Sequence, residues 1–132
     1  TVNAAVPSLN EGASIIFNTS VSNVKWMPGV SIYWSSKAAL RSIVRTLAAE
    51  LAGKNICVNA VSPGPIETPI WSKTNLSEAE VNGFAEGVSG QVPLGRFGKG
   101  EEIAKTVLFI ASNDASFITG AEIPVDGGMA QV

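Results

Sequence analysis

The sequence predicts an α/β fold with three strands of a parallel sheet and flanking helices. Residues 14–17 and 56–61 are short apolar runs without alternation, a pattern typical of strands that are covered on both faces. Between them, residues 33–51 carry apolar side chains at helical spacing, and Gly53 is expected to end that helix. Together these segments form a β-α-β unit, so the two strands should be parallel and the crossover right-handed.

Local signals predict the remaining elements. Residues 2–9 show helical spacing, so the chain is expected to open inside a helix whose preceding residues are missing. Ser77 and Glu80 form a capping box, which predicts the start of another helix. Residues 101–112 predict a further helix that begins with two glutamates, and residues 121–125 predict the last strand.

Composition narrows the classes of function. The chain has 132 residues, so residues 1–132 hold one domain at most, and the net charge of −2 without a basic cluster argues against a nucleic-acid partner. No apolar run approaches the ~18 residues that span a bilayer, so no membrane partner is expected. The single cysteine, Cys57, excludes a disulfide within the chain and fits a reducing compartment, so we expect a cytoplasmic protein. The absence of histidine excludes histidine bases and histidine metal ligands, and no metal site is expected.

Chain geometry brings several polar residues to one edge of the predicted sheet. Ser20 and Ser62 follow the two strands, and the carboxyl ends of parallel strands meet at the same edge. Ligands of open α/β sheets bind outside that edge. The start of the helix at Tyr33 and the loop 63–65 should lie beside the same crevice.

Tyr33 and Lys37 lie one helical turn apart and on one face of the helix. A nearby ammonium favours the ionised form of a phenol, which can then give or take a proton at a carbonyl or alcohol oxygen. Ser20 can hydrogen-bond the same oxygen. This trio supplies no electrons, so a partner such as a nicotinamide must carry the hydride. The alternative is an ordinary surface pair and a serine that only bonds its own loop.

The order of the short motifs resembles the classical short-chain dehydrogenase/reductase family. The resemblance runs from end to end of the chain, and the combination is far more specific than any single piece. The motifs are Ser20, Tyr33-x-x-x-Lys37, Asn59-Ala-Val-Ser-Pro-Gly64, Val92-Pro-Leu-Gly-Arg96, Thr119-Gly120 and Val125-Asp-Gly-Gly128.

The resemblance implies a role for each matched residue. Tyr33 matches the general acid/base, Lys37 matches the lysine that activates it and holds the nicotinamide ribose, and Ser20 matches the serine that positions the substrate oxygen. It implies hydride transfer between NAD or NADP and a carbonyl/alcohol pair. The residues implied to line the nicotinamide are Pro63, Gly64, Ile66 and Thr68.

The resemblance also implies an architecture and an assembly. The fold should be the C-terminal half of a Rossmann-like, doubly wound parallel sheet, and the protein should be a homo-oligomer, a tetramer or a dimer. Residues of about 67–90 match the variable substrate lid, in which Trp71 is a candidate substrate contact. Arg96 is expected to anchor its own loop rather than to bind phosphate.

The sequence departs from the family pattern at its N-terminal side. It has no equivalent of the glycine-rich dinucleotide loop or of the residue that selects NAD or NADP. The fourth catalytic residue of the family, an asparagine, would fall before Thr1, because Asn3 is too close to the first strand. We therefore expect residues 1–132 to be the C-terminal part of a single NAD(P)-binding domain that lacks its dinucleotide-binding half, and to be inactive in isolation.

Two other functions compete with an oxidoreductase. Ser22 and Lys25 fit a Ser-x-x-Lys pattern, in which a lysine activates a serine for hydrolysis, although the companion motifs are missing. Alternatively, the chain is a non-catalytic half-domain whose open sheet edge and apolar helix face associate with other surfaces.

Overall fold

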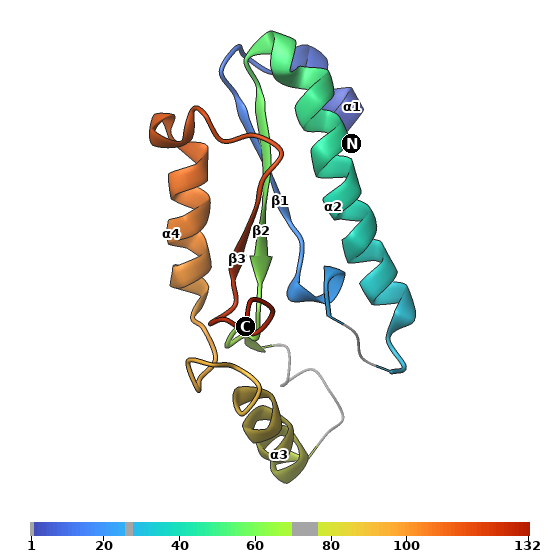
Figure 1. The fold of residues 1–132 in the computed structure, drawn as a ribbon, viewed down its shortest axis with the longest axis vertical. Helices are drawn as coiled ribbons and strands as arrows, with labels where there is room; N and C mark the ends of the chain where they lie inside the picture. Colours follow the sequence, from blue (N-terminus) through green and yellow to red (C-terminus); the bar gives the residue numbers. More distant parts are fainter. Residues whose placement is uncertain (1, 26–27, 70–76) are drawn as a thin grey trace.

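A parallel sheet of three strands forms the centre of the computed structural model, in the order β1-β2-β3 (Figure 1). This confirms the predicted fold class. Both pairings are parallel, with Ile16 beside Asn59 in the first and Val61 beside Ile123 in the second. The strands are β1 (Ser14–Asn18), β2 (Cys57–Pro63) and β3 (Glu122–Val125), within a structure that describes residues 2–25, 28–69 and 77–132.

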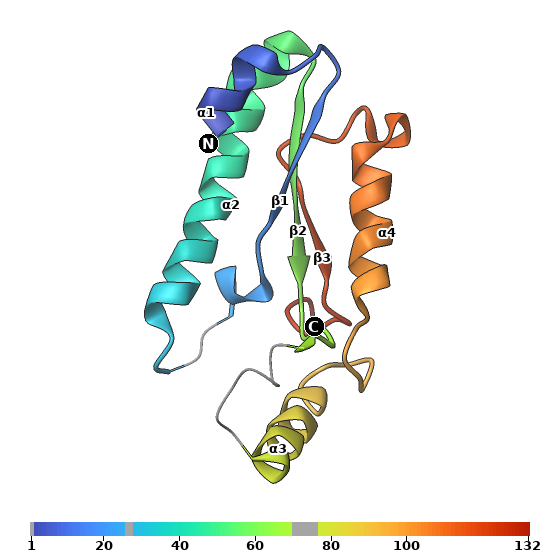
Figure 2. The same ribbon diagram turned by 180° about the vertical axis from the view of Figure 1, so that it is seen from behind.

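A long helix covers each face of the sheet, as Figures 1 and 2 show from opposite sides. Helix α2 (Ser31–Leu51) packs on the first face, where Val44, Leu47 and Val58 belong to one buried cluster. Helix α4 (Gly100–Ala111) packs on the second face. This alternation of faces explains the unbroken apolar runs in β1 and β2, because each strand buries side chains on both sides.

The ends of α2 differ from the prediction. The helix begins at Ser31, two residues earlier than expected, and a 3-10 turn, η3 (Ala52–Lys54), follows it. Asn55, not Gly53, adopts the left-handed conformation after this turn, with φ of 55°. Asparagine tolerates this region, and its amide also donates a 2.6 Å hydrogen bond to Glu11. Although α2 has 21 residues, no helix in the described part is long and apolar enough to cross a membrane.

Two further helical regions lie outside these layers. Helix α1 (Val2–Ala5) and the 3-10 turn η1 (Val6–Ser8) pack their apolar residues against the α2 side of the core. Helix α3 (Glu78–Ser89) lies beyond the carboxyl ends of the strands (Figure 1). Its first turn shows the predicted capping box, in which Ser77 and Glu80 each bond the other's backbone N–H.

Candidate active site

Ser20 lies at the carboxyl edge of the sheet, immediately after β1. It caps a short 3-10 turn, η2 (Val21–Asn23), and its hydroxyl accepts a 3.2 Å hydrogen bond from the backbone N–H of Ser22. The turn η2 packs against α2, the helix that carries Tyr33 and Lys37. The fold therefore brings the Ser20 segment beside the other two catalytic candidates.

Tyr33 and Lys37 lie in the first two turns of α2. The ammonium nitrogen of Lys37 is 5.6 Å from the centre of the Tyr33 ring, and it donates a 3.1 Å hydrogen bond to the backbone carbonyl of Asn18. Half of Tyr33 is exposed, at 51%, and its hydroxyl has no hydrogen-bond partner among the described residues. The phenol is thus accessible to a ligand, and the lysine ties the helix to the end of β1.

The loop after β2 is bonded to the end of β3. The N–H of Gly64 donates a 3.0 Å hydrogen bond to Val125, and a Cβ at this position would lie 2.7 Å from the Cα of Asp126. The close approach to Asp126 therefore requires a glycine at position 64, whatever else this residue lies beside. Its place beside a nicotinamide stays a prediction, as does that of Pro63.

Ile66 and Thr68, the other two residues predicted to line the nicotinamide, have different surroundings. Ile66 pairs with Gly98 in an isolated bridge that ties the loop to the segment before α4. Thr68 lines a cavity of about 470 Å³ together with Ala85 and Ser89. This cavity is bordered by α3, in the region predicted to be the substrate lid, whereas Trp71 lies outside the described residues.

Two buried polar side chains stabilise the edge, and their roles were not apparent from the sequence. Asn59 is completely buried, donates to the carbonyl of Ile118 at 2.7 Å and accepts from the N–H of Ala121 at 3.0 Å. The carboxylate of Asp126 accepts hydrogen bonds from the N–H groups of Gly128 and Ala130, both at 2.9 Å. These bonds fix the start and the end of β3, which explains why both residues belong to short motifs of the chain.

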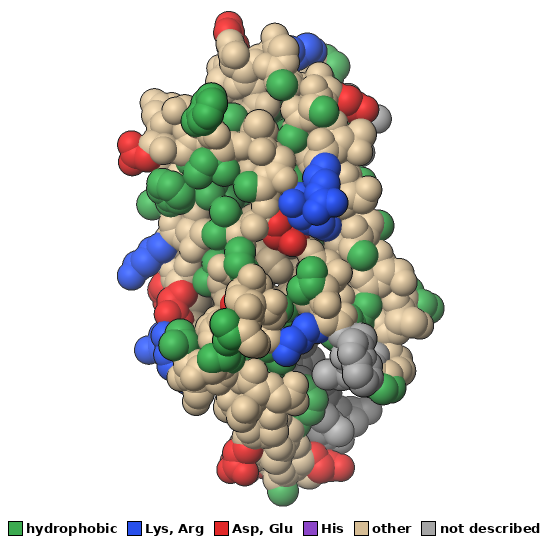
Figure 3. Space-filling view, in the orientation of Figure 1, with side chains coloured by type: hydrophobic (Ala, Val, Ile, Leu, Met, Phe, Trp, Pro, Cys, Tyr) green, Lys and Arg blue, Asp and Glu red, His purple; other side chains and the backbone are tan. Residues whose placement is uncertain are grey.

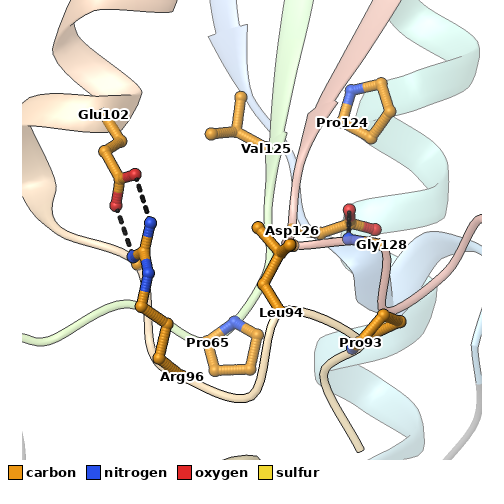
Figure 4. A pocket seen from close by; sticks show the side chains of 11 residues that line it. Pro65, Pro93, Leu94, Arg96, Glu102, Pro124, Val125, Asp126 and Gly128 are labelled. Atoms are coloured by element: carbon orange, nitrogen blue, oxygen red, sulfur yellow. Dashed lines mark hydrogen bonds and ion pairs between the residues drawn. The ribbon is translucent and has the colours of Figure 1, made fainter.

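A separate pocket of about 440 Å³ lies between β3 and the loop before α4 (Figure 4). Arg96 and Glu102 form a bidentate ion pair on its wall, with N–O distances of 2.9 and 2.8 Å. The hydrogen bond from Arg96, followed by that from the N–H of Lys99, lowers the pKa of Glu102 to about 2. Arg96 also bonds the carbonyl of Phe97, which confirms that it anchors its own loop. None of the predicted site residues is among those that line this pocket.

The Ser-x-x-Lys alternative is wrong for this structure. Only 5% of Ser22 is exposed, and its hydroxyl has no hydrogen-bond partner among the described residues. A nucleophilic serine has to reach its substrate and bond an activating base, and Ser22 does neither.

The exposed edge fits a ligand that carries hydroxyl groups and a reducible carbonyl. An ammonium group has more N–H donors than the single bond of Lys37 to Asn18 uses, so it can also bind ribose hydroxyls. The Tyr33 hydroxyl lacks a partner in the described part of the chain and is exposed, as a proton donor to a bound oxygen must be. These residues fit a nicotinamide cofactor together with a carbonyl substrate.

Comparison with known families gives a match along almost the whole chain. Residues 1–130 match the family model described as "Enoyl-(Acyl carrier protein) reductase". The 3-oxoacyl-(acyl-carrier-protein) reductase of Thermotoga maritima is 44% identical over 116 residues, which are 88% of this chain and 45% of that protein.

Two solved structures share the fold. A short-chain dehydrogenase/reductase of Serratia marcescens superposes with a TM-score of 0.86 at 33% identity, over 98% of this chain and 50% of the other. A blue fluorescent protein from a metagenomic library, in complex with NADPH, gives 0.85 at 34% identity, with the same coverage of 98% and 50%. The chain thus spans about half the length of the relatives it matches.

Proposed function

The chain belongs to the short-chain dehydrogenase/reductase family, and we propose that its protein transfers hydride between NAD or NADP and a small carbonyl/alcohol substrate. The observation that carries the proposal is the pairing of Tyr33 and Lys37 at the carboxyl edge, beside the Ser20 segment. A bound nicotinamide supplies the hydride.

Each of the three side chains has one task in this proposal. Tyr33 donates its phenolic proton to the carbonyl oxygen during reduction and takes it back during oxidation. Lys37 favours the phenolate by its charge and binds ribose hydroxyls with the N–H groups that do not bond Asn18. Ser20 donates its hydroxyl proton to the same substrate oxygen, because its bond with the N–H of Ser22 uses the hydroxyl only as an acceptor and leaves the O–H free to donate.

The cofactor cradle extends beyond these residues in the proposal. Pro63, at the end of β2, lines the nicotinamide together with Gly64, Ile66 and Thr68 of the loop that follows, and Thr68 also borders the cavity beside α3. The proposal treats residues 1–132 as the C-terminal part of one NAD(P)-binding domain, and their match to about half of each relative supports it. On this account the 132-residue chain alone does not turn over substrate.

The protein is proposed to act as a homo-oligomer, a dimer or a tetramer. Hydrophobic side chains gather over α4 and the turn that follows it (Figure 3). Leu108 is 73% exposed, and Phe117 is fully exposed. A second copy of the protein that covers this surface would remove both side chains from water. A cytoplasmic location likewise stays a prediction from the single cysteine.

The Tyr33→Phe variant tests the proposed function in the full-length protein. It removes only the hydroxyl, so NAD(P)H binding, followed by fluorescence, should be unchanged, while NAD(P)H oxidation with a panel of ketones and 3-oxoacyl thioesters should stop. Glu50→Ala, at an exposed position of α2, is the matched control and should leave both unchanged. Retained turnover in Tyr33→Phe would exclude the assigned acid, and failure to bind either nucleotide would favour the non-catalytic alternative.

A further inference from the structure

The Ser20 segment rests on a carboxylate from the far end of the chain. Glu122 is the first residue of β3, and the pairing of β3 with β2 places it on the face of the sheet that α2 covers. Its carboxylate accepts hydrogen bonds from Thr19 at 2.5 Å and from the amide of Asn23 at 2.6 and 2.7 Å. Thr19 precedes Ser20 directly, and Asn23 ends the turn η2 that Ser20 caps. One carboxylate thus holds the Ser20 segment on both sides.

The same carboxylate reaches the helix that carries the proposed acid. The Nε atom of Arg41 lies 3.5 Å from Glu122, and its Nη1 donates a 3.0 Å hydrogen bond to the carbonyl of Gly120. Arg41 lies one helical turn after Lys37 on α2. Glu122 therefore links three elements, namely the Ser20 segment, α2 and β3.

We propose that Glu122 is a positioning residue, which fixes Ser20 relative to Tyr33 and Lys37 through Thr19, Asn23 and Arg41. The inference rests on the proposed function, because it concerns the alignment of two groups on one substrate oxygen. A displacement of such a group by about 1 Å can lower the rate about a hundred-fold. Glu122 itself is not a catalytic residue, because its carboxylate is occupied by these donors.

We expect the acceptor oxygens of Glu122, rather than its charge, to hold the Ser20 segment in place. The Oδ1 atom of Asn23 is buried without a hydrogen-bond partner, while its Nδ2 bonds both oxygens of Glu122. In Glu122→Gln, a flip of the Asn23 amide pairs this idle oxygen with the new N–H group, and the glutamine oxygen still accepts from Thr19. Glu122→Ala leaves the amide of Asn23 without its acceptor, whereas the hydroxyl of Thr19 can still donate to the carbonyl of Val61.

Steady-state kinetics of the full-length protein test the proposal first. We expect Glu122→Ala to lower kcat about a hundred-fold with the KM for NAD(P)H unchanged, and Glu122→Gln to restore most of the loss. In a Ser20→Ala background, Glu122→Ala should change kcat little further, because its effect passes through Ser20. Equal losses in both backgrounds would show a general structural role and overturn the proposal.

Hydrogen exchange provides a readout that does not depend on activity. Loss of one such bond corresponds to about ten-fold faster exchange, which we expect in Glu122→Ala for the N–H groups of Asn23 and Val24, but not for those of residues 58–61 in β2. Glu50→Ala should leave both sets unchanged. If Glu122→Ala does not fold, Asn23→Ala is used instead. It removes only the hydrogen bonds between Asn23 and Glu122, so exchange at the N–H groups of residues 23 and 24 should become faster by a smaller factor.

The two failures are distinguishable. Unchanged exchange at Asn23 and Val24 overturns the positioning role of Glu122, whatever the activity. Absence of turnover in the unsubstituted protein overturns the proposed function, and the exchange experiment then still decides whether Glu122 holds the Ser20 segment.

Discussion

Two arginine–glutamate pairs in the described part of the chain differ in almost every respect. Arg96 and Glu102 are six residues apart, bond through two short contacts and have side chains that are 52% and 40% exposed. Arg41 and Glu122 lie in different elements, approach only to 3.5 Å and have side chains that are 19% and 13% exposed. The first pair has nearly ideal geometry, whereas the second has a long contact in a half-buried place.

The bond distances alone would suggest that the pair of Arg96 and Glu102 stabilises the protein more than the pair of Arg41 and Glu122, and we expect the opposite. An exposed pair is screened by water, and its local loop can close without it, so the pair around Glu102 should contribute little. Glu122 accepts from Thr19 and Asn23 as well as contacting Arg41, and its removal leaves the half-buried amide of Asn23 without an acceptor. The comparison indicates that the number of elements joined by a carboxylate matters more than the length of one contact.

Glu122→Ala should cause the largest loss of stability among these changes. Leaving the amide of Asn23 without its acceptor should cost about 1–3 kcal/mol in the free energy of unfolding, measured by urea denaturation of the full-length protein, whereas the hydroxyl of Thr19 keeps the carbonyl of Val61 as an acceptor. Glu102→Ala is the matched change in the exposed pair. Similar losses of unfolding free energy in the two variants would contradict the conclusion that a carboxylate joining several elements contributes more.

Arg41→Met should have an intermediate effect. Methionine retains much of the apolar stem but loses the hydrogen bond to Gly120 and the contact with Glu122, whose other two partners remain. We expect a loss of about 1 kcal/mol in the free energy of unfolding by the same denaturation measurement. A loss equal to that of Glu122→Ala would mean that the ion pair, rather than the shared acceptor, stabilises this region.

Glu102→Ala should lower the free energy of unfolding at neutral pH least of the three variants, because water screens this exposed pair, and its difference from the unsubstituted protein should disappear in acid. The bond from Arg96 lowers the pKa of Glu102 to about 2 from its ordinary value of 4.5. A lowered pKa stabilises the folded state above 4.5, and this contribution is lost as the pH falls toward 2. The carboxyl carbon of Glu102 should therefore still report an ionised group near pH 3 by NMR, and a midpoint near 4.5 would contradict the pair.

The same contrast explains what the sequence could predict. The β-α-β unit, the capping box of Ser77 and Glu80 and the local anchor at Arg96 depend on neighbours in the chain, and all three predictions are confirmed. The periodicity of apolar residues carries this information, because it repeats within each element.

Contacts between distant segments could not be predicted from the periodicity of apolar residues. Glu122 lies 99 residues from Asn23, and nothing in its neighbourhood distinguishes a shared acceptor from an ordinary strand residue. The sequence did not indicate that a Cβ at Gly64 would meet Asp126, or that Asn55 rather than Gly53 would be the left-handed residue. At both positions, contacts between distant segments determine the conformation, and these contacts cannot be predicted from the local sequence.

The most direct test of the central claim follows the hydride itself. The full-length protein is incubated with a ketone or 3-oxoacyl thioester and with NADH or NADPH that carries deuterium at both positions of C4 of the nicotinamide, and the product is analysed by mass spectrometry. We predict an alcohol with deuterium on the former carbonyl carbon, formed by the unsubstituted protein and not by Tyr33→Phe. An alcohol without deuterium, or the same product from Tyr33→Phe, would contradict the account.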